Sequence, residues 1–95
     1  MVNTRIIVDW SQIASASAFY DLVLPQCGSP SWHGRNLNAL NDSWVTGDID
    51  SGGPPFDFVI QNMDTVSQTL SPIADAVLQI AQASVAANGG SCVWI

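Results

Sequence analysis

The sequence predicts an α/β fold in which a three-stranded parallel sheet packs with about four helices. Three short, mostly apolar runs at residues 6–8, 56–60 and 92–95 have the length and composition of strands. Helical patterns lie between these runs, in the order β, α, α, β, α, α, β, and strands joined by helical crossovers run parallel. A chain of 95 residues can bury one core, so we expect residues 1–95 to form a single domain.

The first strand and the helix after it are predicted from the N-terminal third of the chain. Ile6–Val8 is apolar without a break, which is typical of a strand buried on both faces and predicts helices on both sides of the sheet. Ser15 or Ser17 is expected to cap the following helix, and Pro25 is expected to end it. Residues 25–35 then form a loop rich in Pro, Gly and Ser.

The second helix is predicted to begin at Asn36, whose side chain suits an N-cap. An apolar stripe at helical spacing is expected to face the core: Leu37, Leu40 and Trp44. A second stripe is entirely polar: Asn38, Asn41 and Asp42. The helix follows a loop that holds Trp32 and His33 side by side, and loops that carry large aromatic residues usually contact something. The polar stripe and this loop are therefore candidate binding elements.

The C-terminal half is predicted to open with a second loop. This loop covers residues 45–55 and adds two carboxylates, Asp48 and Asp50. After the middle strand, Asp64 is expected to cap a short helix over residues 65–70.

The last helix is expected to start with Ser71 as its N-cap and Pro72 in its first helical position. The run Asn88–Gly90 is expected to stop that helix before the final strand. Two large aromatic residues, Trp44 and Trp94, are both expected to pack in the core.

Charge limits the class of partner. The formal net charge is −6, and the chain has no Lys and no Glu. Residues 1–35 sum to zero, while residues 36–95 hold six Asp and no Lys or Arg. An acidic chain without a basic patch does not bind nucleic acid by neutralising phosphates, but it does attract a basic partner. The alternative explanation is a solvated acidic surface that only keeps the protein in solution.

The sequence also predicts where the protein resides. No apolar run approaches the ~18 residues of a membrane span, and the run at 6–8 is too short for a signal peptide. We therefore expect a cytoplasmic protein without membrane contact, in which the thiols of Cys27 and Cys92 stay reduced. The two cysteines lack metal-ligand spacing, so neither a metal nor another cofactor is expected.

Residues 30–42, Pro-Ser-Trp-His-Gly-Arg-Asn-Leu-Asn-Ala-Leu-Asn-Asp, carry the most specific pattern in the chain. This segment resembles the signature of the barstar family, in which a Pro and two aromatic or near-aromatic residues precede Gly-x-Asn-Leu-Asp-Ala-Leu-Trp-Asp. Seven positions match it in type and spacing: Pro30, Gly34, Asn36, Leu37, Ala39, Leu40 and Asp42. The resemblance runs without a gap from about Ile6 to Trp44, and the order of elements beyond it is also barstar-like.

The resemblance implies an intracellular, immunity-type inhibitor of a basic, barnase-like ribonuclease. Such inhibitors lay the start of the second helix, and the loop before it, across the active-site cleft, where a carboxylate replaces an RNA phosphate. It implies that role for Asp42, an aromatic contact for Trp32, a neighbouring contact for His33 and a close approach at Gly34. The expected partner is a protein, a ribonuclease or toxin domain, bound by a monomer in a 1:1 complex without direct nucleic-acid contact.

Two positions depart from the family pattern: Asn38 stands where the family has its first helical Asp, and Asn41 where it has Trp. Asn forms hydrogen bonds but has no charge, so one of two ion pairs with cleft arginines is weakened or lost. Asp48 or Asp50 could partly replace it. The predicted partner-binding residues are therefore Trp32, His33, Gly34, Asn38, Asn41, Asp42 and Asp48.

Other functions stay open at this point. The same scaffold could serve as an immunity protein against a different toxin, which would account for Asn38 and Asn41. Cys27 and His33 could form a thiol–imidazole pair oriented by Asp42, which would make the chain an enzyme. The single His and the lack of a phosphate-binding loop or metal spacing argue against catalysis, so we expect no enzyme. A purely structural role is the remaining alternative.

Overall fold

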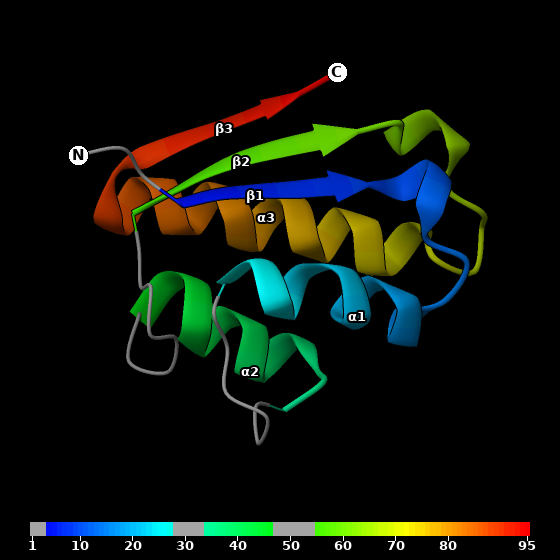
Figure 1. Cartoon of the computed structure of the whole chain (residues 1–95), viewed down its shortest axis with the longest axis horizontal. Helices are drawn as coiled ribbons and strands as arrows, with labels where there is room; N and C mark the ends of the chain where they lie inside the picture. Colours follow the sequence, from blue (N-terminus) through cyan, green and yellow to red (C-terminus); the bar gives the residue numbers. More distant parts are fainter. Residues whose placement is uncertain (1–3, 28–33, 47–54) are drawn as a thin grey trace.

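The computed structural model describes residues 4–27, 34–46 and 55–95, and it contains the predicted three-stranded parallel sheet, in the order β1-β2-β3 (Figure 1). The strands and helices of this part are β1 (Thr4–Asp9), α1 (Ala16–Cys27), α2 (Leu37–Asn41), β2 (Phe56–Gln61), α3 (Ser71–Asn88) and β3 (Gly90–Trp94). Shorter turns complete it: the 3-10 turns η1 (Trp10–Gln12) and η3 (Met63–Thr65), and the π-helical turn η2 (Asp42–Thr46). No helix of these three ranges has the length and apolar composition needed to cross a membrane.

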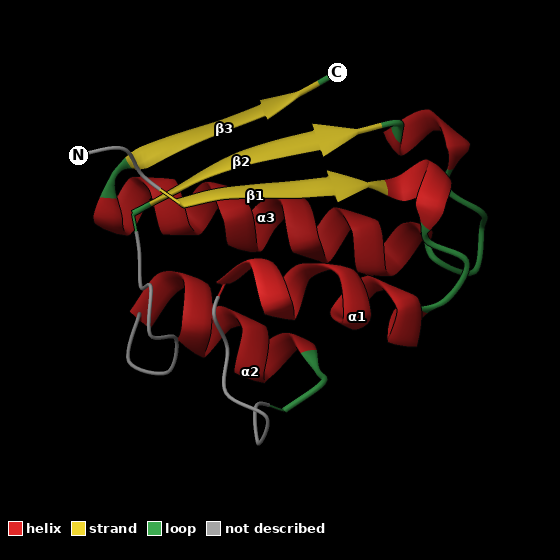
Figure 2. Cartoon of the chain, viewed as in Figure 1, coloured by secondary structure: helices red, strands yellow, loops and turns green. Residues whose placement is uncertain are grey.

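The helices lie together on one side of the strands (Figure 2). Burial alternates along β1, because Ile6 and Val8 are fully buried while Ile7 between them is 40% exposed. The prediction that the strands are buried on both faces is therefore wrong. A continuous apolar run does not distinguish the two cases, because β-branched residues also suit the open face of a sheet.

Aromatic side chains fill the space between the sheet and the helices. Trp44 is fully buried, as predicted, and its ring centroid lies 4.7 Å from that of Phe58. Trp10 stacks on Phe19 with 5.5 Å between ring centroids. Trp94 is 57% exposed, so the prediction that it packs in the core is wrong. Its strand β3 is an edge strand of the sheet, with a neighbouring strand on one side only.

Helix α1 begins as predicted but extends further. The Ser15 hydroxyl accepts a hydrogen bond from the Ala18 N–H at 3.1 Å and caps the helix. Pro25 does not end the helix, which continues to Cys27, so the predicted stop is wrong. An interior proline loses its own N–H donor and crowds the carbonyl four residues earlier, and the burial of Leu24 and Cys27 at this end of the helix offsets that cost.

The predicted helix over residues 65–70 does not form. The chain makes the short turn η3 instead, with Asp64 inside the turn and not at a cap position. The Thr65 hydroxyl donates to the Asn62 carbonyl at 2.7 Å, and the Ser67 hydroxyl accepts from the Leu70 N–H at 3.3 Å. Local bonds from Ser and Thr side chains to the backbone compete with a helix, which explains the difference.

Helix α3 is close to the prediction at both ends. It begins at Ser71, one residue earlier than expected, because Leu70 takes the N-cap position and Pro72 still lies in the first turn. It ends before Gly89, as predicted, with the Gly89 N–H donating to the Val85 carbonyl at 2.9 Å.

The junction between α3 and β3 requires glycine for two different reasons. Gly89 and Gly90 both have positive φ angles, of 86° and 89°. A Cβ atom on Gly90 would lie 2.1 Å from the Phe56 carbonyl oxygen, whereas one on Gly89 would meet nothing within 4 Å. The close approach of β3 to β2 therefore depends on Gly90 in particular.

We expect Gly90→Ala to lower the free energy of unfolding by about 1–3 kcal/mol more than Gly89→Ala. Both variants strain a left-handed backbone, but only the first also pushes β3 away from β2. Urea denaturation of the two variants provides the comparison. Equal losses would show that the strand approach at Phe56 contributes nothing.

Candidate functional site

The candidate site is the outward side of residues 37–46, where α2 continues directly into the π-helical turn η2. One side of this segment is buried: Leu40, Ser43 and Trp44. The other side is exposed: Asn38, Asn41 and Asp42. The apolar and polar stripes predicted from the sequence are therefore confirmed. Turns of π type are rare in helices and are frequently found at functional sites.

The start of this segment is held by its own cap. The Asn36 side-chain oxygen accepts from the Ala39 N–H at 2.8 Å, from an extended backbone, which confirms the predicted N-cap. A Cβ atom on Gly34 would lie 3.0 Å from both the Ala39 Cβ and the Asn36 amide nitrogen. The absence of a side chain at Gly34 thus allows its backbone to pack closely on the first turn of the helix.

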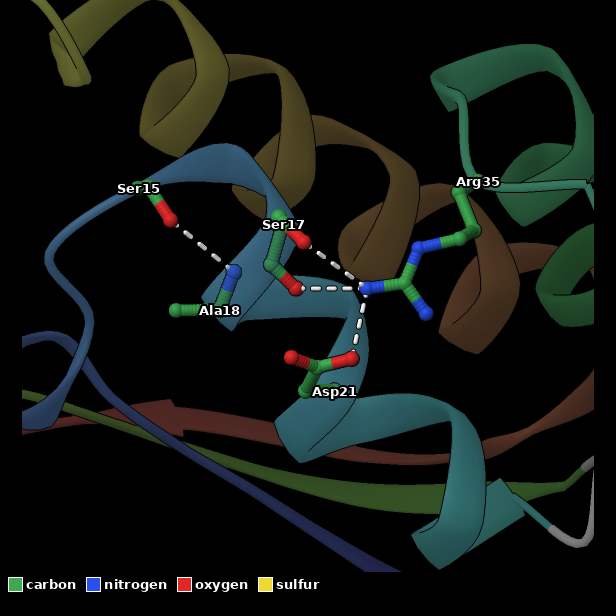
Figure 3. A network of polar contacts seen from close by, with 5 residues as sticks. All are labelled: Ser15, Ser17, Ala18, Asp21 and Arg35. Carbon is green, nitrogen blue, oxygen red and sulfur yellow. Dashed lines mark hydrogen bonds and ion pairs between the residues drawn. The ribbon is translucent and has the colours of Figure 1, made fainter.

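Arg35 ties the same end to helix α1 (Figure 3). Its Nη2 donates to the Asp21 carboxylate at 2.6 Å, to the Ser17 carbonyl at 2.8 Å and to the Ser17 hydroxyl at 3.2 Å. The guanidinium also lies over the Tyr20 ring, 5.9 Å from its centroid. The ion pair alone contributes little, because both side chains are largely exposed, but the four contacts together join the segment to α1.

The Arg35 charge is therefore directed toward α1 and away from the exposed stripe. Residues 34–46 hold only two ionisable side chains, Arg35 and Asp42. Since the first is engaged by Asp21, Asp42 carries the one negative charge that the segment presents to solvent. Burial raises the pKa of Tyr20 above 10.0, and the Arg35 cation partly opposes that rise.

The C-terminal end of the segment is fixed by the core and by α3. The indole N–H of Trp44 donates to the Cys27 Sγ at 3.1 Å inside the core. The Asn88 side-chain amide donates to the Val45 carbonyl at 2.7 Å and lies 3.4 Å from the Trp44 carbonyl. Because both ends are anchored, Asn38, Asn41 and Asp42 are presented on a backbone with little freedom to rearrange.

The position of Cys27 bears on the hypothesis of a thiol enzyme. Its side chain is 1% exposed, and its sulfur accepts the Trp44 indole N–H. A catalytic thiolate needs access to substrate, and a side chain that is 1% exposed does not have it. This placement counts against Cys27 as a nucleophile.

A groove of about 380 Å³ runs between α2 and α3 beside the exposed stripe. Its α2 wall is formed by Leu37, Asn38 and Asn41, and its α3 wall by Ala76, Gln79, Ile80 and Ala83. The polar groups that line it are all side-chain amides, without a charge. Two predicted binding residues thus line a groove, whereas Asp42 is not among its lining residues.

The α3 wall was not predicted from the sequence. Its members recur at the i, i+3, i+4 and i+7 spacing of one helix face, and this spacing is the signal that identifies them.

The structure brings part of the predicted set together. Asn38, Asn41 and Asp42 share one exposed face, and Gly34 lies at the start of the segment that carries them. The other predicted contacts, Trp32, His33 and Asp48, lie outside the described residues, as does Asp50.

Comparison with known proteins identifies the family. Residues 3–94 match the family described as Barstar (barnase inhibitor), so the chain belongs to the barstar family. One similar protein is that of Bacillus subtilis (strain 168) named "Putative ribonuclease inhibitor YrdF". It is 31% identical over 78 residues, which cover 82% of this chain and 81% of the relative. The match extends through the C-terminal half, where the motif resemblance ended.

The contact between Arg35 and Tyr20 is testable, because the chain has a single tyrosine. Arg35→Gln removes the cation and keeps most of the aliphatic stem, so we expect the pKa of Tyr20 to rise further. Ultraviolet titration of the tyrosinate measures this pKa. Because the folded pKa of Tyr20 is raised, its contribution to stability is present below pH 10 and is lost as the pH rises through the folded pKa.

The matched control for this titration is Arg5→Gln, which removes the same charge from β1. We expect it to leave the Tyr20 titration where it is. A Tyr20 midpoint that moves equally in both variants, or that does not move in Arg35→Gln, would contradict the contact between the Arg35 guanidinium and the Tyr20 ring.

Proposed function

We propose that this protein inhibits a basic, barnase-like ribonuclease by covering its active site. In this proposal, residues 34–46 and the loop before them lie across the catalytic cleft, and the Asp42 carboxylate takes the place of an RNA phosphate. The observation that carries the proposal is the exposure of Asp42 on an anchored segment. The motif resemblance assigns the family's phosphate-mimicking Asp to this position. Trp32 and His33 are proposed to contact the same cleft.

The chemistry of such a cleft suits this face. A ribonuclease holds RNA phosphates with Arg, Lys and His, and a carboxylate accepts charge-assisted hydrogen bonds from the same groups. The net charge of −6 would steer a basic enzyme toward the inhibitor and speed their encounter. In the barnase–barstar pair, which belongs to this family, close charge pairs couple by roughly 1.5–7 kcal/mol.

The two asparagines of the exposed face indicate what kind of partner surface they would contact. Asn38 and Asn41 are exposed on the same face and supply hydrogen bonds without charge. We propose that they meet a part of the ribonuclease with less positive charge than the part that meets Asp42. Asp48, or Asp50 in the same loop, is proposed to contribute at the rim of the interface.

A second target has support from one observation. The polar side chains that line the groove between α2 and α3 are the neutral amides of Asn38, Asn41 and Gln79. A partner that binds only through ion pairs would require carboxylates at these positions. The alternative proposal is therefore an immunity protein on the same scaffold that binds a different toxin. Both proposals place the partner on the same face and expect one partner for each inhibitor chain.

Asp42→Ala tests the proposal directly. We expect it to raise the inhibition constant for a barnase-like ribonuclease at least about 30-fold, because truncating one partner of a buried charge pair at an interface costs about 2–5 kcal/mol or more. RNA-cleavage assays with increasing inhibitor concentration measure it. The wild-type association rate should also fall as salt is added.

Asp64→Ala is the matched control, since it removes an exposed carboxylate from η3 and leaves the α2 face intact. It should change inhibition little. If no barnase-like enzyme is inhibited at micromolar concentrations, or if the two variants lose inhibition equally, Asp42 does not have the proposed role.

Asn38→Asp distinguishes the two proposed targets. If the partner is a barnase-like ribonuclease with two cleft arginines, the variant restores the second ion pair and should lower the inhibition constant about tenfold. Asn41→Asp adds the same charge on the same face, at the position of the family's Trp, and serves as control. Equal gains from both variants would reflect net charge only, and a loss from Asn38→Asp would favour the alternative toxin.

A further inference from the structure

The two edges of the sheet differ in whether their outward backbone groups have hydrogen-bond partners. At the β1 edge, the Ile7 N–H donates to the Gln26 side-chain oxygen at 2.8 Å, and the Gln26 amide nitrogen donates to the Ile7 carbonyl at 2.9 Å. The same nitrogen also donates to the Leu22 carbonyl at 3.0 Å, which holds the side chain in place. Both outward backbone groups of Ile7 are therefore paired as a neighbouring strand would pair them, which blocks the middle of this edge to another strand.

The β3 edge is open in the described part of the chain. The Ile95 N–H donates to the Ile60 carbonyl at 2.9 Å, and the Ile95 carbonyl accepts from the Asn62 N–H at 3.1 Å, so Ile95 faces β2. Because alternate residues of a parallel strand face the same neighbour, Val93 also faces β2. The N–H and C=O groups of Cys92 and Trp94 then point away from the sheet.

The side chains of β3 are those of an interior strand. Val93 is 51% exposed, Trp94 57% and Ile95 81%. Successive side chains of a strand lie on opposite faces, so this edge is apolar both above and below the sheet. Residues 90–95 contain no charged side chain and no Pro, and the chain has no Lys, so the usual side chains that keep sheet edges apart are missing here.

We propose that β3 pairs with β3 of a second copy of this chain, antiparallel across a two-fold axis, to join two sheets into one of six strands. A two-fold pair needs only one strand that is complementary to itself, and an uncharged apolar strand meets that need. Because Gln26 blocks the middle of the other edge, the assembly stops at two copies and does not grow into a fibre.

This dimer leaves the candidate inhibitory face accessible. In Figure 1, β3 lies at one side of the molecule and α2 at the opposite side, with β1 and α1 between them. Each copy can therefore still bind one partner, and the monomer expected from the sequence becomes a pair. An interface of one strand edge is small, so we expect the pairing to be weak, in the micromolar range.

Sedimentation equilibrium of the full chain, from about 5 to about 500 μM, tests the pairing. Salt of about 0.3 M screens the repulsion between two acidic copies. We expect a reversible monomer–dimer equilibrium for the wild type. Val93→Lys should abolish it, because it places like charges near each other across the two-fold axis.

Ile7→Lys is the matched control, since Ile7 lies on the same outer face but on the blocked edge strand, and is 40% exposed. It makes the same change in net charge and should leave the dimer intact. Loss of the dimer in both variants would indicate packing between sheet faces and overturn the proposal. A dimer that survives Val93→Lys, or a wild type that stays monomeric throughout, would overturn it as well.

Hydrogen exchange of the wild type gives a second test that needs no variant. The amides of Cys92 and Trp94 should exchange quickly in dilute solution and become protected as concentration rises, while the Val93 amide stays protected throughout. Protection that does not alternate along β3, or that does not depend on concentration, would contradict strand pairing. Both tests are independent of the proposed inhibition, which is measured with Asp42→Ala.

Discussion

Burial of Trp44 is the interaction on which the candidate site depends. Its indole is fully enclosed, donates to the Cys27 Sγ at 3.1 Å and packs against Phe58 of the central strand. One side chain thereby joins residues 37–46 to both α1 and the sheet. Loss of a buried aromatic of this size costs about 3–5 kcal/mol, more than the exposed contacts at the start of α2 can supply. Because Asp42 precedes Trp44 by two positions, insertion of the indole also sets the direction in which that carboxylate points.

The anchoring has a consequence for binding. A protein that must order its interface on binding loses free energy for each side chain or loop that becomes fixed. Here the ordering is completed on folding, by the Asn36 cap, the Arg35 contacts and the Asn88 amide at the other end. A short helix of five residues would be unstable alone, so these tertiary contacts are what maintain it.

The sequence predicts this region well because several local signals agree there. An N-cap at Asn36 and the spacing of Leu40 and Trp44 have one physical solution, an amphipathic helix with its polar face outward. The exposure of Trp94 could not be predicted, because it depends on which strands lie at the edges, a property of the whole sheet. The prediction that Pro25 ends α1 is wrong for a related reason, since tertiary burial of the helix end overrides the local preference of proline against a helix interior.

The distribution of charge connects the two proposed surfaces. In the two proposals, the net charge of −6 would attract a basic ribonuclease and, at low salt, would repel a second acidic copy from the β3 edge. When a basic partner occupies each α2 face, it neutralises much of that charge and weakens the repulsion between copies. By thermodynamic linkage, if partner binding raises the affinity of β3 pairing by some factor, pairing raises the affinity for the partner by the same factor. The two surfaces lie on opposite sides of the molecule, so they are coupled through the electrostatic field and need no change in conformation.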